Sequence, residues 1–325
     1  MLAYIVRRLL HALPILIGVN LITFALFFVV NTPDDMARMQ LGIKRVTPEA
    51  IQKWKVERGY DRPLLFNEKA EGQGKLTDTI FYAKSVRMFA FDFGRADDGR
   101  DIAREIRMRM GPSLAIALPV FVLGLYLSIA FALLLVFFRG TYLDFWGVAT
   151  CVALMSISSL FYIIGGQFLV SKMWHLVPIS GYADGPDMAR FLALPVLISV
   201  AAGIGGNTRW YRTIFLEEIG KDYVRTARAK GLSELSVLFR HVLRNALIPI
   251  LTGVVAVIPL LFMGSLITES FFGIPGLGSY TIDAINAQDF AVVKAMVFIG
   301  SGMYIVGLLL TDISYTLVDP RVRFE

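Results

Sequence analysis

Six long apolar runs dominate this 325-residue sequence and constrain what it can fold into. A helix needs about 20 apolar residues to cross a membrane, because the hydrocarbon layer is about 30 Å thick and each residue adds about 1.5 Å. The runs cover residues 12–30, 114–138, 146–170, 191–208, 246–268 and 291–311. We therefore predict an all-α polytopic membrane protein with six transmembrane helices and one large loop after the first.

Composition agrees with this prediction and excludes several other classes of protein. Hydrophobic residues make up 56% of the chain and charged residues 18%, against about 25% charged residues in ordinary soluble domains. The net charge of +6 is distributed as membrane topology predicts, so it does not indicate binding to nucleic acid. The sequence has one cysteine, Cys151, and its histidines (His11, His175 and His241) lack metal-ligand spacing.

Basic residues in the short loops predict the orientation of the chain. Residues 1–11, 139–145, 209–245 and 313–325 together carry 13 Lys and Arg, whereas 171–190 and 269–290 carry two. Positive charge concentrates in cytoplasmic loops, so both termini and the 209–245 loop are expected in the cytosol. The first apolar run is longer than a signal-peptide core and ends Val-Val-Asn-Thr-Pro, so we interpret it as a retained helix.

This topology divides the chain into three predicted parts. They are the N-terminus with the first helix (1–30), an extracytoplasmic loop (31–113) and a five-helix core (114–325). In the loop, Thr47 and Pro48 predict a helix start and Gly59 predicts its end. Residues 101–110 predict a second helix along the membrane surface. The loop is interpreted as a cap on the first two spans, with direct solute contact as the alternative.

The predicted spans contain few groups that could do chemistry. Their interiors hold no Asp, Glu, Lys, Arg or His, and Lys294 lies near the outer end of the sixth. Proton-coupled carriers usually need ionisable groups at depth, so this pattern argues against proton coupling. Milder polar groups at depth include Asn20, Ser158, Ser159 and Gln167, which either bond between helices or line a translocation pathway.

The sequence also lacks the motifs of an enzyme. Residues 72–75 read Gly-Gln-Gly-Lys, but the first glycine of a phosphate-binding loop is missing and Leu76 follows the lysine. Neither a G-x-S-x-G turn nor an H-E-x-x-H pair is present. We therefore expect no catalytic residue and no cofactor in this chain, and a partner must supply the energy for any uphill transport.

The most charged short segment lies between Arg209 and Arg244, where we count eight basic and four acidic residues. One apolar face recurs at helical spacing at Leu216, Ile219, Tyr223 and Ala227. Glu217 and Lys221 are spaced to pair at i,i+4.

Gly231 predicts the end of this helix, and Ser233 is placed to cap a second short helix. The second helix has a predicted apolar face at Leu235, Leu238, Phe239, Val242 and Leu243. Two interpretations remain open. The helix pair either packs on lipid and on its own spans, or presents its charged face to a cytosolic partner.

Two stretches here resemble a known family. Tyr223–Gly231 reads Tyr-Val-Arg-Thr-Ala-Arg-Ala-Lys-Gly, and with Arg240–Pro249 it is similar to the EAA loop of binding-protein-dependent ABC importer permeases. The dipeptide/oligopeptide/nickel family is the most similar. Further resemblance lies at Tyr4–Leu10, Thr47–Glu49, Asp61–Pro63, Asp92–Gly94, Pro275–Gly278 and Asp312–Arg321. The last stretch resembles the Yej-type branch, associated with peptide and microcin C uptake.

The resemblance implies a type I ABC importer permease fold in the bacterial cytoplasmic (inner) membrane. Its implied partners are a second homologous permease subunit, two ATP-binding cassette domains holding ATP and magnesium, a periplasmic solute-binding protein and a peptide substrate. The implied ATPase-coupling residues are Asp222, Tyr223, Arg225, Thr226, Ala227, Lys230 and Gly231. Alternatives are a permease for nickel or another small solute, a secondary transporter and a scaffolding protein.

The chain departs from the family pattern at three places. The general motif has Glu-Ala-Ala six residues ahead of its glycine, whereas this chain has Arg225-Thr226-Ala227. The proline after the loop is shifted to Pro249, and the usual Pro-Gly-Asp-Pro after the first span reads Asn-Thr-Pro-Asp-Asp at 31–35. A basic residue therefore stands where the general motif has an acidic one.

Overall fold

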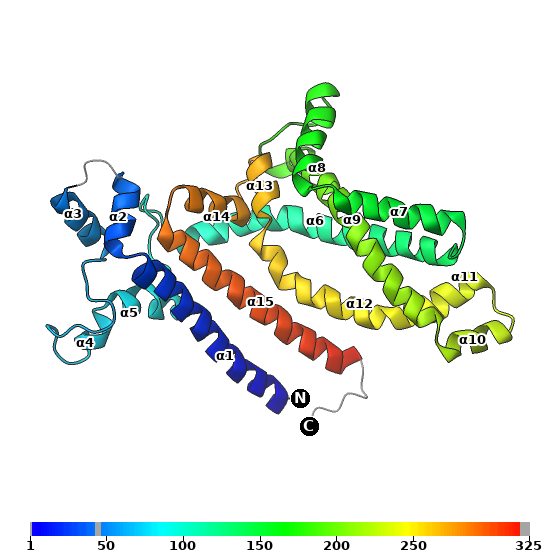
Figure 1. Cartoon of the computed structure of the whole chain (residues 1–325), viewed down its shortest axis with the longest axis horizontal. Coiled ribbons are helices and arrows are strands. Elements are labelled where there is room, and N and C mark those ends of the chain that lie inside the picture. Colours follow the sequence, from blue (N-terminus) through cyan, green and yellow to red (C-terminus); the bar gives the residue numbers. More distant parts are fainter. Residues whose placement is uncertain (1, 43–46, 319–325) are drawn as a thin grey trace. The chain divides into compact units, whose positions relative to one another are not determined.

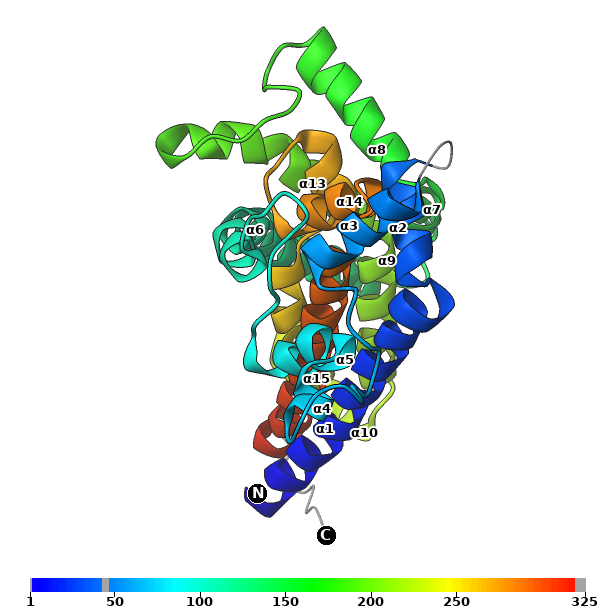
Figure 2. The same ribbon diagram turned by 90° about the vertical axis from the view of Figure 1, so that its left-hand side faces the viewer.

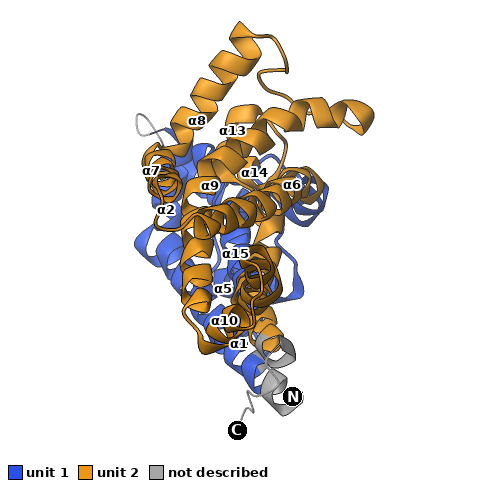
Figure 3. Ribbon diagram, turned by 90° about the vertical axis from the view of Figure 1, so that its right-hand side faces the viewer, with its two compact units in different colours: residues 1–109, 280–306 blue, residues 110–279, 307–325 orange. Residues whose placement is uncertain are grey.

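The predicted all-α architecture is confirmed in residues 2–42 and 47–318, the part that the computed structural model describes (Figure 1). These residues form no β-strand and make one isolated antiparallel bridge, between Arg95 and Asp101. The chain forms two compact units, residues 1–109 with 280–306 and residues 110–279 with 307–325 (Figure 3). Residues 280–306 thus group with the predicted first span and loop, whereas the predicted topology assigned them to the five-helix core.

Unit 1 holds the N-terminal helices and part of the C-terminal ones. Its complete helices are α1 (Leu2–Ala25), the π-helix η1 (Leu26–Val30), α2 (Pro33–Leu41), α3 (Pro48–Arg58), α4 (Gly74–Thr77), α5 (Ile80–Lys84) and the 3₁₀-helix η2 (Val86–Ala90). It also holds the start of α6 (Ile102–Phe137), most of α14 (Leu277–Asn286) and the first half of α15 (Phe290–Val318).

Unit 2 holds the rest of α6 and α15 and all the helices between α6 and α14. These are α7 (Tyr142–Ser156), α8 (Ser159–Gly166), the π-helix η3 (Gln167–Met173), the 3₁₀-helix η4 (Gly185–Asp187), α9 (Met188–Ile219), α10 (Asp222–Ala229), α11 (Glu234–Ser236), the π-helix η5 (Val237–Leu243), α12 (Arg244–Val257), the 3₁₀-helix η6 (Ile258–Met263) and α13 (Leu266–Phe272).

Five helical segments of the described chain are long and apolar enough to cross a membrane. They are Leu10–Val30, Ile102–Phe137, Gly185–Ile219, Glu234–Met263 and Phe290–Ser314. The remaining predicted span, the third (residues 146–170), is broken, because α7 and the following α8 with η3 meet at 86°. Figure 1 shows the two directions, and Figure 2 shows α7 end-on with α8 extending away from it. The described chain therefore has six spans only if this bent pair counts as one.

Two local predictions in the loop had different outcomes. The helix predicted from Thr47 to Gly59 is confirmed: the Thr47 hydroxyl accepts a bond from the Ala50 amide, and Gly59 ends α3 at a φ of +69°. The second helix, predicted at 101–110 along the membrane surface, is helical from Ile102, but it is not separate from the second span. It opens α6, which has 36 residues and includes Pro112 and Pro119. The polar first turns of α6 are thus continuous with the apolar second span.

The core of unit 1 forms where the first span meets the loop helices. Phe24 and Phe28 pack with Trp54, Tyr60 and other buried residues of α2 and α5. Lys294 of α15 is also buried, and its ammonium donates to the Lys84 carbonyl at 2.6 Å and the Ser85 hydroxyl at 2.7 Å. The same ammonium lies 5.2 Å from the ring centres of Phe24 and Phe28. It thus connects α15 to the end of α5 and to α1 inside this unit.

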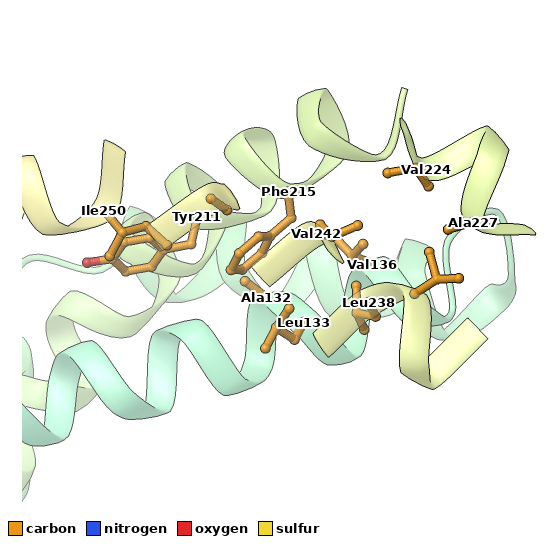
Figure 4. Packing of buried hydrophobic residues seen from close by; sticks show 12 residues of the cluster. Ala132, Leu133, Val136, Tyr211, Phe215, Val224, Ala227, Leu238, Val242 and Ile250 are labelled. Atoms are coloured by element: carbon orange, nitrogen blue, oxygen red, sulfur yellow. The ribbon is translucent and has the colours of Figure 1, made fainter. Parts of the chain in front are cut away.

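One core of unit 2 brings together segments far apart in the sequence (Figure 4). We call its twelve buried members the α10 cluster: Ala132, Leu133, Val136, Tyr211, Phe215, Val224, Ala227, Val237, Leu238, Val242, Ala246 and Ile250. They come from α6, α9, α10, η5 and α12. Burying one Val, Leu or Phe side chain contributes about 1.5–3 kcal/mol, so the cluster fixes α10 against the ends of α6 and α9.

Candidate functional site

The short helix α10 is held by its apolar face and leaves its charged face free. Val224 and Ala227 point into the α10 cluster (Figure 4). Opposite them, the Asp222 and Arg225 side chains are 95% and 75% exposed, and Thr226 and Lys230 are also exposed. These four positions recur at the i, i+3, i+4, i+8 spacing of one helix face. The free face can contact another protein without disturbing the cluster.

The junction between α9 and α10 is built around a buried carboxylate. Glu218 accepts hydrogen bonds from the Tyr223 hydroxyl and the Lys221 ammonium. Burial, followed by the bond to Glu218, raises the pKa of Tyr223 to about 12. The predicted pairing of Lys221 with Glu217 is wrong, because α9 ends at Ile219 and the chain turns before α10. Tyr223 therefore anchors the junction and does not extend from it.

The turn after α10 has a conformation that favours glycine. Gly231 has a φ of +79°, and its amide donates to the Arg228 carbonyl at 2.9 Å. A Cβ at this position would meet no atom within 4 Å, so the requirement is conformational and not steric. Across the turn, Arg228 donates twice to the Glu234 carboxylate, at 2.8 and 3.1 Å. This bidentate pair closes the turn from both sides.

The second predicted short helix is instead the beginning of the fifth span. Ser233 caps it as predicted, accepting a bond from the Ser236 amide. The helix then continues through η5 and α12 to Met263. Its predicted apolar face is only partly buried: Leu238 is 5% exposed, whereas Leu235 is 55% exposed. Val237, which lies outside the predicted face, is buried instead, because the wider turn of the π-helix η5 changes which side chains point inward.

A second ion pair fixes the neighbouring helices of this end. Arg212 of α9 donates twice to Asp144 at the start of α7, at 3.0 and 2.8 Å, and the Gly140 amide donates to the same carboxylate. Both charged side chains are largely buried. Breaking a buried pair costs about 3–5 kcal/mol, because the remaining charge is left unpaired. The pair therefore fixes α7 to α9 near the α10 cluster.

The four predicted pathway residues have different surroundings. In unit 1, Asn20 is buried and its amide donates to the Ser85 carbonyl at 3.3 Å. In unit 2, the Gln167 amide donates to the carbonyls of Ile179 and Phe271, both at 3.1 Å. Ser158 lies exposed at the break between α7 and α8, and Ser159 lines a cavity. Ser159 is the one of these four that reaches that cavity.

That cavity has a volume of about 540 Å³ and lies within unit 2. Its walls are side chains of α6, α8, α9, η6 and α13, including Ile116, Ile163 and Ile198. Polar groups reach it from Ser159, Ser199 and the chain around α13. The volume falls in the range of about 300–1,000 Å³ typical of small-molecule pockets.

One wall of the cavity is the segment 264–279, which we call the Glu269 turn. Glu269 is completely buried, and its carboxylate accepts bonds from the amides of Ser265 and Ser279, both at 3.1 Å. The Ser113 hydroxyl of α6 accepts from the Leu277 amide at 2.7 Å and also bonds to this carboxylate. Burial raises the pKa of Glu269, and these donors oppose the increase.

Glycines make room for this buried carboxylate. A Cβ at Gly264 or Gly276 would collide with a carboxylate oxygen of Glu269, and a Cβ at Gly278 would collide with the Ser265 backbone. By sequence, Glu269 falls at the start of the short loop 269–290, and its burial was not predicted. The sequence feature that could have predicted this burial is the set of glycines on both sides of a single acidic residue. The sequence analysis also missed Ser113, whose contacts connect residues 164 positions apart.

Metal ligation has no candidate site among the described residues. No group of three or more His, Cys, Asp or Glu side chains is gathered there. Cys151 is a free, buried thiol in α7.

Comparison with known proteins gives full-length matches. A family model described as "Binding-protein-dependent transport system inner membrane component" matches residues 108–324, and its N-terminal counterpart matches residues 1–70. A Brucella abortus protein provisionally named a peptide transport system permease protein is 32% identical over 331 residues. The oligopeptide transport system permease protein AppB of Bacillus subtilis is 29% identical over 340 residues, and the dipeptide transport system permease protein DppB of Escherichia coli is 28% identical over 352. Each match covers 100% of both chains.

Proposed function

Since the chain belongs to the family of binding-protein-dependent transport system inner membrane components, we propose that it is a permease subunit of an ATP-driven peptide importer. The full-length similarity to peptide, oligopeptide and dipeptide permeases supports the substrate class. The single observation that carries the coupling role is the exposed charged face of α10 on a buried apolar base. The chain itself carries out no bond-making chemistry.

In this proposal α10 is the contact with an ATP-hydrolysing partner. Asp222, Arg225, Thr226 and Lys230 make that contact, while Tyr223 and Ala227 hold α10 on the protein side. When the partner moves α10, the α10 cluster transmits the movement to α6, α9 and η5. Rigid packing favours such transmission, because packed interiors resist compression. The π-turns of η5 and Pro249 in α12 supply places where the fifth span can bend.

The remaining partners and the orientation belong to the same proposal. A second permease subunit completes the pathway, two ATP-binding cassette domains bind ATP and magnesium, and a periplasmic binding protein delivers the peptide. Both termini and α10 lie in the cytosol, as the excess of basic residues on that side indicates. The pathway then alternates between an outward and an inward opening.

The coupling role is tested by Gly231→Val against the matched control Gly59→Val. Both glycines end a helix at positive φ, and neither has an atom within 4 Å of a built Cβ. A β-branched residue at such a φ is strained by about 1–2 kcal/mol. Both changes should therefore lower the free energy of unfolding by a similar amount. We expect only Gly231→Val to abolish peptide uptake and peptide-stimulated ATP hydrolysis in the reconstituted complex. Equal activity of the two variants would contradict the coupling role.

The contact and the orientation are tested by cross-linking. Thr226→Cys places a thiol on the exposed face of α10, and Ser270→Cys places one on an exposed position of α13. The native Cys151 is buried, so its background is low. We expect Thr226→Cys to cross-link to an ATPase subunit and Ser270→Cys not to. Cross-linking of Ser270→Cys to the ATPase would reverse the proposed orientation.

The substrate class is tested by uptake in cells that lack the native gene. The deletion strain should no longer import trialanine. Expression of the chain in that strain should restore the import. Import of radioactive nickel without import of peptides would overturn the peptide assignment and leave the permease role intact.

A further inference from the structure

The cavity beside the Glu269 turn has the character of an uncharged binding site. Its walls are mainly aliphatic, with Ile116, Ile163 and Ile198 from three different helices. Ala117 of α6 and Ala202 of α9 also line it, and their small side chains leave room inside. A cavity of about 540 Å³ holds a small ligand and not a folded partner.

The one acidic side chain in the cavity wall already accepts hydrogen bonds from the protein itself. Glu269 receives bonds from the backbone amides of Ser265, Gly278 and Ser279 in its own turn and from the Ser113 hydroxyl of α6. With the carboxylate completely buried against glycines, no face of it is open to a solute ammonium group. Glu269 therefore shapes the wall and does not attract cationic ligands.

Two hydroxyls of the wall remain available to a ligand. Ser159 at the start of α8 and Ser199 of α9 line the cavity. Neither side chain bonds to any other residue in 2–42 or 47–318, although Ser156 in the neighbouring helix bonds to the Val152 carbonyl. A serine hydroxyl can donate one hydrogen bond and accept others. The pair can thus bond an amide group, which has both a donor and an acceptor.

We propose that this cavity holds an uncharged stretch of the transported peptide. Ser159 and Ser199 bond to a backbone amide, and an aliphatic side chain packs against the three isoleucines. A charged side chain is disfavoured there, because burial of an unpaired charge is costly. The inference rests on the proposed function, and it assigns to this subunit a contact with the peptide itself.

The test compares uptake of trialanine with uptake of the tripeptide that has leucine in its middle position. All strains carry the same binding protein and ATPases, so a change in the ratio reports on this chain alone. We expect Ala117→Val, which narrows the cavity, to lower import of the leucine peptide at least fivefold more than import of trialanine. The control Ala130→Val lies on an exposed position of the same helix and should leave the ratio unchanged.

Removal of a hydroxyl gives a second, milder variant. Ser199→Ala should reduce import of both peptides about 2–12-fold, the value of one hydrogen bond. The control Ser156→Ala removes a hydroxyl that is already bonded to its own helix, and should import both peptides as the native chain does. Membrane abundance of each variant is measured alongside.

Two outcomes would overturn the inference: an unchanged ratio in Ala117→Val, or unchanged import of both peptides in Ser199→Ala. Failure of the proposed function is a separate result, because peptide import would then not depend on the native chain at all.

Discussion

At one end of unit 2, Asp222 and Arg225 stand on the exposed face of α10, whereas at the other end Glu269 is buried completely. The α10 cluster contains no charged side chain, and the Asp222 and Arg225 side chains on the opposite face of α10 are exposed, although Glu218 is buried at the junction with α9. The Glu269 turn does the reverse: it draws a carboxylate inside and surrounds it with amides and glycines. The same unit therefore uses acidic residues for two different purposes.

This difference follows from the energetics of charge in and out of water. An exposed ion pair such as Asp222 with Arg225 contributes little to stability and is free to be exchanged for a partner's charges. A buried carboxylate needs every donor that the fold can supply, so it fixes the position of whatever donates to it. The α10 end is suited to contact and the Glu269 turn to holding a fixed shape.

The largest expected difference in stability is between two alanine variants, Glu269→Ala at the buried carboxylate and Asp222→Ala at the exposed one. Glu269→Ala leaves the amides of Ser265 and Ser279 and the Ser113 hydroxyl without this acceptor. We expect the free energy of unfolding to fall by about 3–9 kcal/mol, at about 1–3 kcal/mol for each of these three groups. Asp222→Ala should not measurably change stability. Thermal unfolding in detergent measures both.

Glu269→Gln sharpens this prediction, because the amide keeps the shape but accepts at only one of its two terminal atoms. Its stability should lie between those of the native chain and Glu269→Ala. If Glu269→Ala unfolds at the native temperature, the carboxylate does not organise the turn.

A smaller effect is expected from two leucines that lie one turn apart in the fifth span. Leu238 is buried in the α10 cluster and Leu235 is exposed. Leu238→Ala should lower the free energy of unfolding by about 2–5 kcal/mol, the usual cost of a large-to-small change in a core. In Leu235→Ala we expect little change. Equal destabilisation by the two changes would mean that the cluster does not carry α10.

The smallest effect on stability is expected from the ion pair across the Gly231 turn. Arg228 and Glu234 are partly exposed, so a double-mutant cycle with alanine should give a coupling energy of about 0.2–1 kcal/mol. The same variants should impair peptide-stimulated ATP hydrolysis more than stability, because the pair orients the exposed face of α10. A large loss of stability with unchanged ATP hydrolysis would assign the pair a purely structural role.

Local features of the fold could be read from the sequence with good accuracy. Thr47, Gly59, Ser233 and Gly231 end or begin helices where their own backbone chemistry predicts. Such signals depend on neighbours within a few residues. The pairing of Lys221 failed for the opposite reason: the helix ends between Glu217 and Lys221, so their spacing no longer places them on one face.

Long-range contacts could not be read in the same way. Apolar length predicts that residues 146–170 are membrane-embedded, but it says nothing about an 86° bend between α7 and α8. Asn20, Ser159 and Gln167 looked equivalent, because each is a polar residue in an apolar run. The structure separates them, since carbonyls distant in sequence engage Asn20 and Gln167 and leave Ser159 at the cavity.

The sequence alone determined that this is an all-helical membrane protein with a charged segment between spans, because apolar length and charge are properties of the residues themselves. Only the tertiary structure decided which face of α10 is free and that Glu269 is buried. Both depend on which distant segments pack together. The Glu269 carboxylate became a structural centre only when Ser113 of α6 and the 264–279 segment met around it.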